Sequence, residues 1–253
     1  MTTRLCEWRV LNCNGLRMEV ITLKIHGLNK TTLLDYPGRV AATVFTGGCN
    51  FRCPFCHNGE LVRQPDLFPM IAEEEILAFL RKRKGVLSGV CITGGEPTLQ
   101  PDLAAFIGKI KDIGLAVKLD TNGYRPEVLK ELLQKGMLDY VAMDIKNSLG
   151  KYALTAGCPK LDTAPVEESV RLIRESGTEY EFRTTVVKEL HDASDFAQIG
   201  EWLSDARAYF LQAYRDNENV IQRGFTSYTK EELEAFLPAL REKIEKVELR
   251  GID

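Results

Sequence analysis

Short apolar segments alternate with amphipathic segments of helix length along most of this 253-residue chain. Strands are expected near residues 19–25, 39–46, 89–93, 115–120, 139–145, 180–187, 207–212 and 246–250. Helices are expected near residues 71–83, 101–113, 126–135, 165–176, 193–204 and 229–242. This alternation predicts βα units, and therefore an α/β fold whose parallel sheet has right-handed crossovers.

One large domain accounts for most of the chain. No long linker, internal repeat or low-complexity stretch divides residues 21–253, and a hydrophobic content of 44% is ordinary for a globular protein. Residues 1–20 are interpreted as an N-terminal extension, which is either a genuine, disordered segment or the product of an overlong start assignment.

Three cysteines lie close together directly after the strand expected at 39–46. Cys49, Cys53 and Cys56 follow a pair of glycines with the spacing CxxxCxxC. A [4Fe–4S] cube is usually held by four cysteine thiolates, so three of them would leave one iron without a protein ligand. Such an open iron can bind a reactant, and the spacing therefore predicts a reactive cluster.

Other interpretations of these cysteines stay open at this point. Zinc also takes Cys₃His sets, but His57 directly follows Cys56 and is a poor fourth ligand. Disulfides are favoured less, because the chain has 7 cysteines and no secretory signal. Spacing alone favours a cluster over zinc, and zinc over the rest.

A second motif, Gly94-Gly95-Glu96-Pro97, stands at the end of the strand expected at 89–93. Glycines after a parallel strand let another group approach the backbone closely, and Glu96 adds one carboxylate. Alone this motif would be a weak signal, because many strand-to-helix turns contain glycine. Its place after the cysteine loop makes the combination specific.

The two motifs together resemble those of the radical S-adenosylmethionine superfamily, in which CxxxCxxC binds the cluster and GGEP binds the amino group of S-adenosylmethionine. The resemblance covers roughly residues 24–253 and implies a partial, open (β/α)₆ barrel. Segments similar to the glycyl-radical activating enzymes are 33–38, 45–53, 56–58, 119–123 and 143–146. The ending at 247–253 is similar to one branch, the anaerobic ribonucleoside-triphosphate reductase activating proteins.

The resemblance implies a site built from cofactor ligands, with no further catalytic residue. Cys49, Cys53 and Cys56 would hold one [4Fe–4S] cluster. A single cluster is expected, because only Cys91 lies between the cysteine loop and GGEP, and it sits inside a strand. The residues implied at S-adenosylmethionine are Phe55 at the adenine, Gly94, Gly95, Glu96 and Pro97 at the amino group, and Asp120, Thr121, Asp144, Lys146 and Arg183.

Several of these residues have plainer interpretations. Asp120 could shape a turn or cap a helix, whereas the resemblance places it, with Thr121 and Asp144, at the cofactor carboxylate, where the three could hold a monovalent cation. Lys146 could be a surface lysine, but strand alternation puts it on the same face as Asp144. Arg183 could form a structural ion pair or clamp a carboxylate, and its planar fork favours the clamp.

Residues outside the two motifs carry weaker expectations. His26 and His191 are expected on the surface or in loops, and Cys158 is interpreted as an ordinary loop thiol. Phe196 and Trp202, at helical spacing, are expected in the core.

The resemblance implies an activase that reductively cleaves S-adenosylmethionine and uses the 5′-deoxyadenosyl radical to form a glycyl radical. The implied partners are anaerobic ribonucleotide reductase and a low-potential electron donor such as flavodoxin or ferredoxin. Residues 209–215 lack the Pro-Tyr-His run of the pyruvate formate-lyase branch. Alternatives are a radical SAM enzyme that acts on another glycyl-radical enzyme of the pyruvate formate-lyase type, or on a small molecule or peptide. A non-catalytic metal-binding module is an alternative of another class.

Charge and hydropathy narrow the range of partners. A formal net charge of −3 gives no electrostatic reason to expect a nucleic-acid partner. No apolar run approaches the roughly 18 residues that span a bilayer, so no membrane partner is expected. Free thiols fit a reducing compartment, and a cytoplasmic protein is expected.

Overall fold

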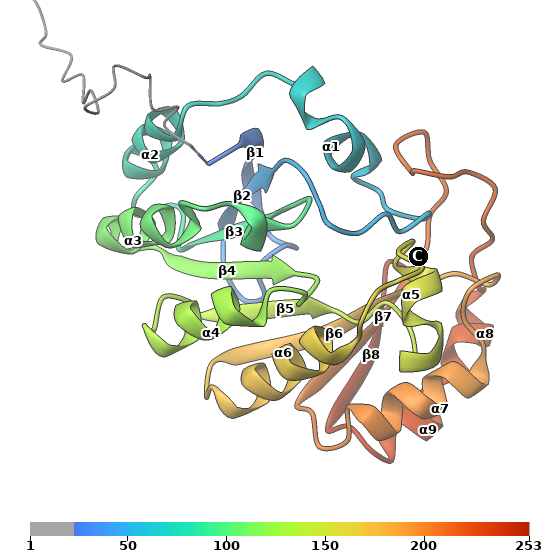
Figure 1. Cartoon of the computed structure of the whole chain (residues 1–253). Coiled ribbons are helices and arrows are strands. Elements are labelled where there is room, and N and C mark those ends of the chain that lie inside the picture. Colours follow the sequence, from blue (N-terminus) through green and yellow to red (C-terminus); the bar gives the residue numbers. More distant parts are fainter. Residues whose placement is uncertain (1–22, 253) are drawn as a thin grey trace, which may run out of the picture.

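A computed structural model describes residues 23–252, which build an eight-stranded curved sheet (Figure 1). The strands follow one another in the sheet in chain order, with β1 antiparallel to β2 and every later pair parallel. In this part of the chain β1 and β8 are the two edges and do not pair, so the barrel is open. The strands are β1 (Ile25–Thr32), β2 (Ala41–Thr46), β3 (Gly89–Gly94), β4 (Ala116–Thr121), β5 (Tyr140–Asp144), β6 (Glu179–Val186), β7 (Ala208–Ala213) and β8 (Lys246–Arg250).

Helices fill the crossovers and cover the outer side of the sheet (Figure 1). The α-helices are α1 (Gly59–Arg63), α2 (Glu73–Lys82), α3 (Leu103–Ile113), α4 (Pro126–Gln134), α5 (Tyr152–Thr155), α6 (Ala164–Glu175), α7 (Ala193–Trp202), α8 (Lys230–Glu234) and α9 (Leu237–Arg241). The 3₁₀ turns are η1 (Pro65–Leu67), η2 (Pro97–Leu99) and η3 (Leu149–Lys151). Among residues 23–252, no helix has the length and apolar character that crossing a lipid bilayer requires.

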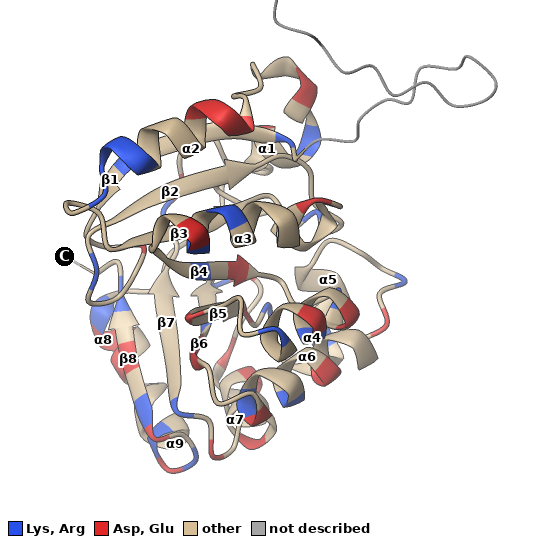
Figure 2. Ribbon diagram, turned by 90° about the vertical axis from the view of Figure 1, so that its left-hand side faces the viewer, with Lys and Arg blue, Asp and Glu red and all other residues tan. Residues whose placement is uncertain are grey.

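Sequence patterns explain the outer helices. In α3 the buried residues include Phe106, Ile107 and Ile110, whose spacing by three and four places them on the face that packs on the sheet. Gly114 ends this helix in the left-handed conformation, with φ 90°, which costs glycine little. In α2 the first turn carries three glutamates and the last turn two basic residues, the arrangement that complements the helix dipole (Figure 2).

The fold predicted from the sequence is confirmed, and most elements begin and end within about two residues of their expected bounds. The helix expected at 229–242 is wrong in one respect, because two short helices, α8 and α9, replace it. Pro238 has no N–H group to donate to the carbonyl of Glu234, so a continuous helix would lose a hydrogen bond at this point.

The strand expected at 19–25 is also misplaced over residues 23–25, the part of it that the structure describes. Residues 1–22, and with them the predicted extension at 1–20, lie outside the described residues. Residues 23 and 24 are not in a strand, and β1 instead begins at Ile25 and continues to Thr32. Its Gly27, Asn29 and Lys30 have low strand propensity, but pairing with β2 holds the segment extended despite two register irregularities.

The inner face of the sheet carries the polar residues that matter for function. Lys118 on β4 and Glu181 on β6 are each 1% exposed, yet both are charged residue types. Charged side chains are buried in proteins only when they are paired or serve a site. The carboxyl ends of β2 to β7 converge above this polar interior, and the candidate site lies there.

Candidate functional site

A cavity of about 410 Å³ opens at the carboxyl ends of β2 to β7. Its wall contains every residue that the sequence predicted at the cluster and at S-adenosylmethionine, except Pro97. Pro97 is buried at the first position of η2. The structure thus brings together residues that are up to 134 positions apart, from Cys49 to Arg183. Such convergence at strand ends is where parallel α/β folds place their sites.

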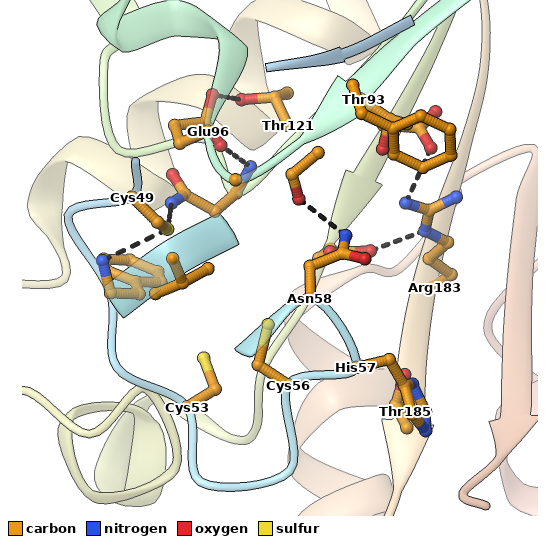
Figure 3. A pocket seen from close by; sticks show the side chains of 18 of the residues that line it. Cys49, Cys53, Cys56, His57, Asn58, Thr93, Glu96, Thr121, Arg183 and Thr185 are labelled. Atoms are coloured by element: carbon orange, nitrogen blue, oxygen red, sulfur yellow. Dashed lines mark hydrogen bonds and ion pairs between the residues drawn. The ribbon is translucent and has the colours of Figure 1, made fainter. Parts of the chain in front are cut away.

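The cysteine loop runs directly out of β2 and turns its thiols toward the cavity (Figure 3). The backbone N–H of Cys56 donates to the carbonyl of Cys53 at 3.0 Å, which tightens the loop between these two cysteines. All three cysteines are free thiols. Burial raises the pKa of Cys49 and Cys53 to about 12, so the protein alone keeps these thiols neutral, and a positively charged metal is needed to hold them as thiolates.

These thiols suit an iron–sulfur cluster by donor type. Within residues 23–252, no three His, Cys, Asp or Glu side chains are arranged to hold a metal ion. A [4Fe–4S] cluster does not need three side chains around one ion, because each thiolate binds a different iron of the cube. Three thiols around one cavity therefore fit a cube with one unligated corner.

The glycines before Glu96 bring two backbones into contact. Gly95 donates its N–H to the carbonyl of Thr46 at 2.8 Å, and the N–H of Glu96 donates to the carbonyl of Gly48 at 2.8 Å. A Cβ on Gly95 would overlap the carbonyl oxygen of Gly48. Gly94 has φ +117°, a conformation that residues with a side chain rarely adopt. The two glycines therefore fasten the cysteine loop to the end of β3.

Replacing Gly95 by alanine is expected to displace the cysteine loop. The added methyl group has no space beside Gly48, so the backbone must move, and overpacking of this kind costs about 1–3 kcal/mol or more. Denaturant unfolding should show this loss, and iron bound after anaerobic reconstitution should fall with it. Gly150→Ala is the matched control, since no atom lies within 4 Å of its Cβ position. Equal stability and iron content in both variants would contradict the role given to Gly95.

Glu96 is a buried carboxylate with four neutral hydrogen-bond donors. Its side chain accepts from the backbone N–H and the hydroxyl of Thr98, at 3.1 and 2.6 Å, and from the hydroxyl of Thr121, at 2.8 Å (Figure 3). The backbone N–H of Asn122 donates to its second oxygen at 2.7 Å. Burial raises the pKa of Glu96, although these donors oppose the shift. Across residues 23–252 no cationic side chain pairs with it.

Two aspartates line the other wall, and three cationic side chains pair with them. Arg183 donates to Asp144 Oδ1 at 2.5 Å and to Asp120 Oδ2 at 3.0 Å. Lys146 Nζ lies 2.9 Å from Asp144 Oδ2, so strand alternation did place these two side by side. Lys118 forms an ion pair with Asp120. Burial opposes ionisation of both carboxyls, but the neighbouring charges hold the pKa of Asp144 well below its usual value and also lower that of Asp120.

This arrangement bears on two expectations. Two carboxylates face three cations here, and the hydroxyl of Thr121 donates to Glu96. A monovalent cation held by Asp120, Thr121 and Asp144 beside the cofactor carboxylate stays a prediction. Arg183 forms ion pairs in this structure, which is the interpretation that the sequence favoured less, and its role as a carboxylate clamp stays a prediction.

His191 was expected on the surface or in a loop; it lies in the loop between β6 and α7, but it is not on the surface, because it is only 1% exposed. The N–H of Val187 lies 3.1 Å from its Nδ1, so Nε2 carries the proton and donates to the carbonyl of Lys146 at 2.8 Å. Its ring stacks on Phe196 and meets the ring of Phe55 edge to face. His191 thus connects the cysteine loop to the end of β5.

Two further residues at the site were missed. Lys118 precedes Asp120 by two residues, so the alternation that paired Asp144 with Lys146 could have found it. Asn122 is 4% exposed and reaches Cys49 from the turn after β4. Nothing in its local sequence shows that this turn packs against the cysteine loop.

A comparison with protein families decides the relationship. The model of the radical SAM superfamily matches residues 43–203, more than half of the chain. The chain belongs to the radical SAM superfamily. This range begins within β2 and contains both the cysteine loop and GGEP.

Relatives of known name agree with this membership. The protein MJ1227 of Methanocaldococcus jannaschii, whose name places it among the glycyl-radical enzyme activating enzymes, is 32% identical over 201 residues, which are 77% of this chain and 81% of MJ1227. A pyruvate formate-lyase-activating enzyme of Clostridium pasteurianum is 35% identical over 130 residues, 49% of this chain and 52% of that enzyme. A 7-carboxy-7-deazaguanine synthase of Thermococcus kodakarensis is 28% identical over 60% of this chain and 66% of the synthase.

Two solved structures with bound S-adenosylmethionine (AdoMet) share the fold. Streptococcus suis SuiB bound to S-adenosylmethionine superposes with a TM-score of 0.64 at 15% identity, over 81% of this chain and 48% of SuiB. The chain therefore corresponds to about half the length of SuiB. The protein anSMEcpe with bound AdoMet gives a TM-score of 0.57 at 18% identity, over 78% of this chain and 57% of that protein. At 15% and 18% sequence identity, these superpositions show that the proteins share an open α/β fold.

Membership also settles the chemistry in outline. The chain is a radical SAM enzyme, and its cofactors are a [4Fe–4S] cluster and S-adenosylmethionine. The free thiols of the cysteine loop suit the cluster, and the carboxylate of Glu96, which has no cationic partner among residues 23–252, suits the cosubstrate's amino group.

Proposed function

We propose that this radical SAM enzyme activates a glycyl-radical enzyme, and that its partner is anaerobic ribonucleoside-triphosphate reductase. The observation that carries the first part is the match to MJ1227, which extends over most of both chains. The second part is supported by the ending at 247–253 and by the lack of a Pro-Tyr-His run at 209–215.

The cavity supports the proposed ligand set, because all three cysteines line it. Cys49, Cys53 and Cys56 hold the cluster, which, when bound, supplies the electron that cleaves the sulfonium bond of S-adenosylmethionine. The protein's own task is to bind, orient and shield the reactants. Phe55, 4% exposed and edge-to-face with His191, gives a fixed apolar wall for the adenine.

Glu96 is the proposed partner of the cosubstrate's amino group. A buried carboxylate without a cation is costly, and an incoming ammonium group relieves that cost. The donors from Thr98, Thr121 and Asn122 hold the carboxylate in place before the ligand arrives. Gly94 and Gly95 keep it beside the cysteine loop, which brings the amino group and the open corner of the cluster together.

The ending at 247–253, which resembles the reductase-activating branch, makes contacts within the fold. Arg250 on β8 donates to both carboxylate oxygens of Glu181 at 2.6 and 2.7 Å, and its guanidinium carbon lies 3.4 Å from the centre of the Phe210 ring. These contacts fasten the edge strand β8 to β6 and β7. Residues 247–253 therefore support the reductase as partner only through their sequence likeness to the activating proteins of that reductase.

The test uses the anaerobically reconstituted full chain with reductant, S-adenosylmethionine and the reductase. We expect a doublet of a glycyl radical in the electron paramagnetic resonance spectrum, and no doublet with a reductase whose radical-site glycine is replaced by alanine. Pyruvate formate-lyase serves as the parallel partner. A doublet on that enzyme only would overturn the choice of reductase. Cleavage of S-adenosylmethionine without any doublet on either partner would overturn the activase proposal itself.

A further inference from the structure

The sulfur of Cys49 has surroundings that differ from those of the other two cysteines. It lies 3.3 Å from the backbone N–H of Phe51 and 3.7 Å from the side-chain amide nitrogen of Asn122 (Figure 3). Both groups can only donate, and hydrogen bonds to sulfur are longer than those to oxygen. In the described part of the chain, no side-chain group donates to the sulfur of Cys53 or Cys56.

The orientation of the Asn122 amide is fixed by its other contacts. Its Oδ1 accepts from the backbone N–H of Tyr124 at 3.0 Å, so the amide group faces the cysteine loop. One N–H of the amide donates to Asn50 Oδ1 at 2.8 Å, and the other is left for Cys49. With 4% exposure, the side chain has little room to turn away. The donor is therefore held in place before any cluster binds.

We propose that Asn122 is a positioning residue that donates a hydrogen bond to the Cys49 thiolate and thereby raises the reduction potential of the cluster. This inference rests on the proposed ligand set. Reduction adds one electron to the cluster, and a donor at a ligand sulfur stabilises the more negative state more than the oxidised state. Burial makes this interaction stronger than it would be in water.

Asn122 also contacts Glu96, the proposed partner of the amino group of S-adenosylmethionine. Its backbone N–H donates to Glu96 while its side chain donates to Cys49, so one turn connects the two binding groups. A side-chain substitution removes the contact to sulfur and leaves the backbone contact to Glu96. The effect on the cluster can therefore be separated from the binding of S-adenosylmethionine.

The test is a redox titration of the full chain, reconstituted anaerobically and followed by electron paramagnetic resonance of the reduced cluster. In Asn122→Leu we expect the ratio of reduced to oxidised cluster at a fixed potential to fall roughly tenfold, which for one electron is about 59 mV. A hydrogen bond to a charged group is worth enough for a change of this size. Asn122→Gln, which keeps an amide donor, should recover part of the shift.

Three outcomes decide the matter. A lower midpoint reduction potential in Asn122→Leu, with unchanged iron and sulfide content, supports the proposal. An unchanged midpoint potential overturns it. If Asn122→Leu assembles no cluster, Asn122→Ala decides by the same criterion, because it removes the side-chain donor to Cys49, adds no charge and needs no additional space. A wild-type chain that forms no cluster would instead overturn the ligand set on which the inference rests.

Discussion

Cys53→Ala is expected to bind no intact [4Fe–4S] cluster and to cleave S-adenosylmethionine no faster than a reaction without enzyme. The loss should be this large because two remaining thiolates hold only two of the four irons. Cys53 is 6% exposed, and burial keeps its thiol neutral in the metal-free protein, so its removal leaves no unpaired charge. Iron and sulfide analysis, the visible absorption of the cluster and the yield of 5′-deoxyadenosine measure the effect.

Cys158→Ala is the matched control for this variant. Its thiol also lies close to the cysteine loop, 3.5 Å from the carbonyl oxygen of Asn50, but it does not line the cavity. We expect this variant to keep both the cluster and cleavage. Full turnover in Cys53→Ala, or equal losses in the two variants, would contradict the assignment of the ligands.

Arg183→Met is expected to lower the free energy of unfolding by about 3–5 kcal/mol. Arg183 is 16% exposed and holds two aspartates, so the substitution leaves Asp120 and Asp144 with only one lysine each in a buried site. Denaturant unfolding of the full chain measures the change. Arg171→Met is the matched control, because Arg171 pairs with Glu168 and Glu175 on the exposed face of α6 and its loss should cost about 1 kcal/mol or less.

The difference between wild type and Arg183→Met should also depend on pH. In the wild type the pKa values of Asp120 and Asp144 are depressed, so their ionisation stabilises the fold above the unfolded-state pKa of about 3.9. This contribution is lost as pH falls through the folded-state values. The stability gap between the two proteins should therefore stay nearly constant from pH 7 to about pH 4 and narrow as the pH falls further. A gap that widens on acidification would contradict the ion-pair account.

Local signals in the sequence were sufficient for the parallel sheet and for most of the cavity wall. The sheet follows from segments such as 89–93, whose apolar run is buried on both faces, and from helices such as α3 with one buried stripe. The site follows from topology, because residues after parallel strands meet at one edge. For that reason Cys49, Glu96 and Asp144 could be placed together without coordinates.

Tertiary contacts decided what the sequence could not show. β1 is extended because β2 supplies its partners, although its glycine and polar residues disfavour a strand. His191 is buried because Phe55, Phe196 and the carbonyl of Lys146 surround it, and two of these residues, Phe55 and Lys146, are far from it in the chain. Each of these outcomes depends on segments that meet only after folding, which a single sequence pattern does not encode.

Mössbauer spectroscopy of the full chain, reconstituted with ⁵⁷Fe without oxygen, tests the central claim most directly. We predict the spectrum of a [4Fe–4S] cluster in which one iron responds to added S-adenosylmethionine, since Cys49, Cys53 and Cys56 leave one corner unligated. Mononuclear iron, or a protein that retains only zinc, would contradict this account of the site.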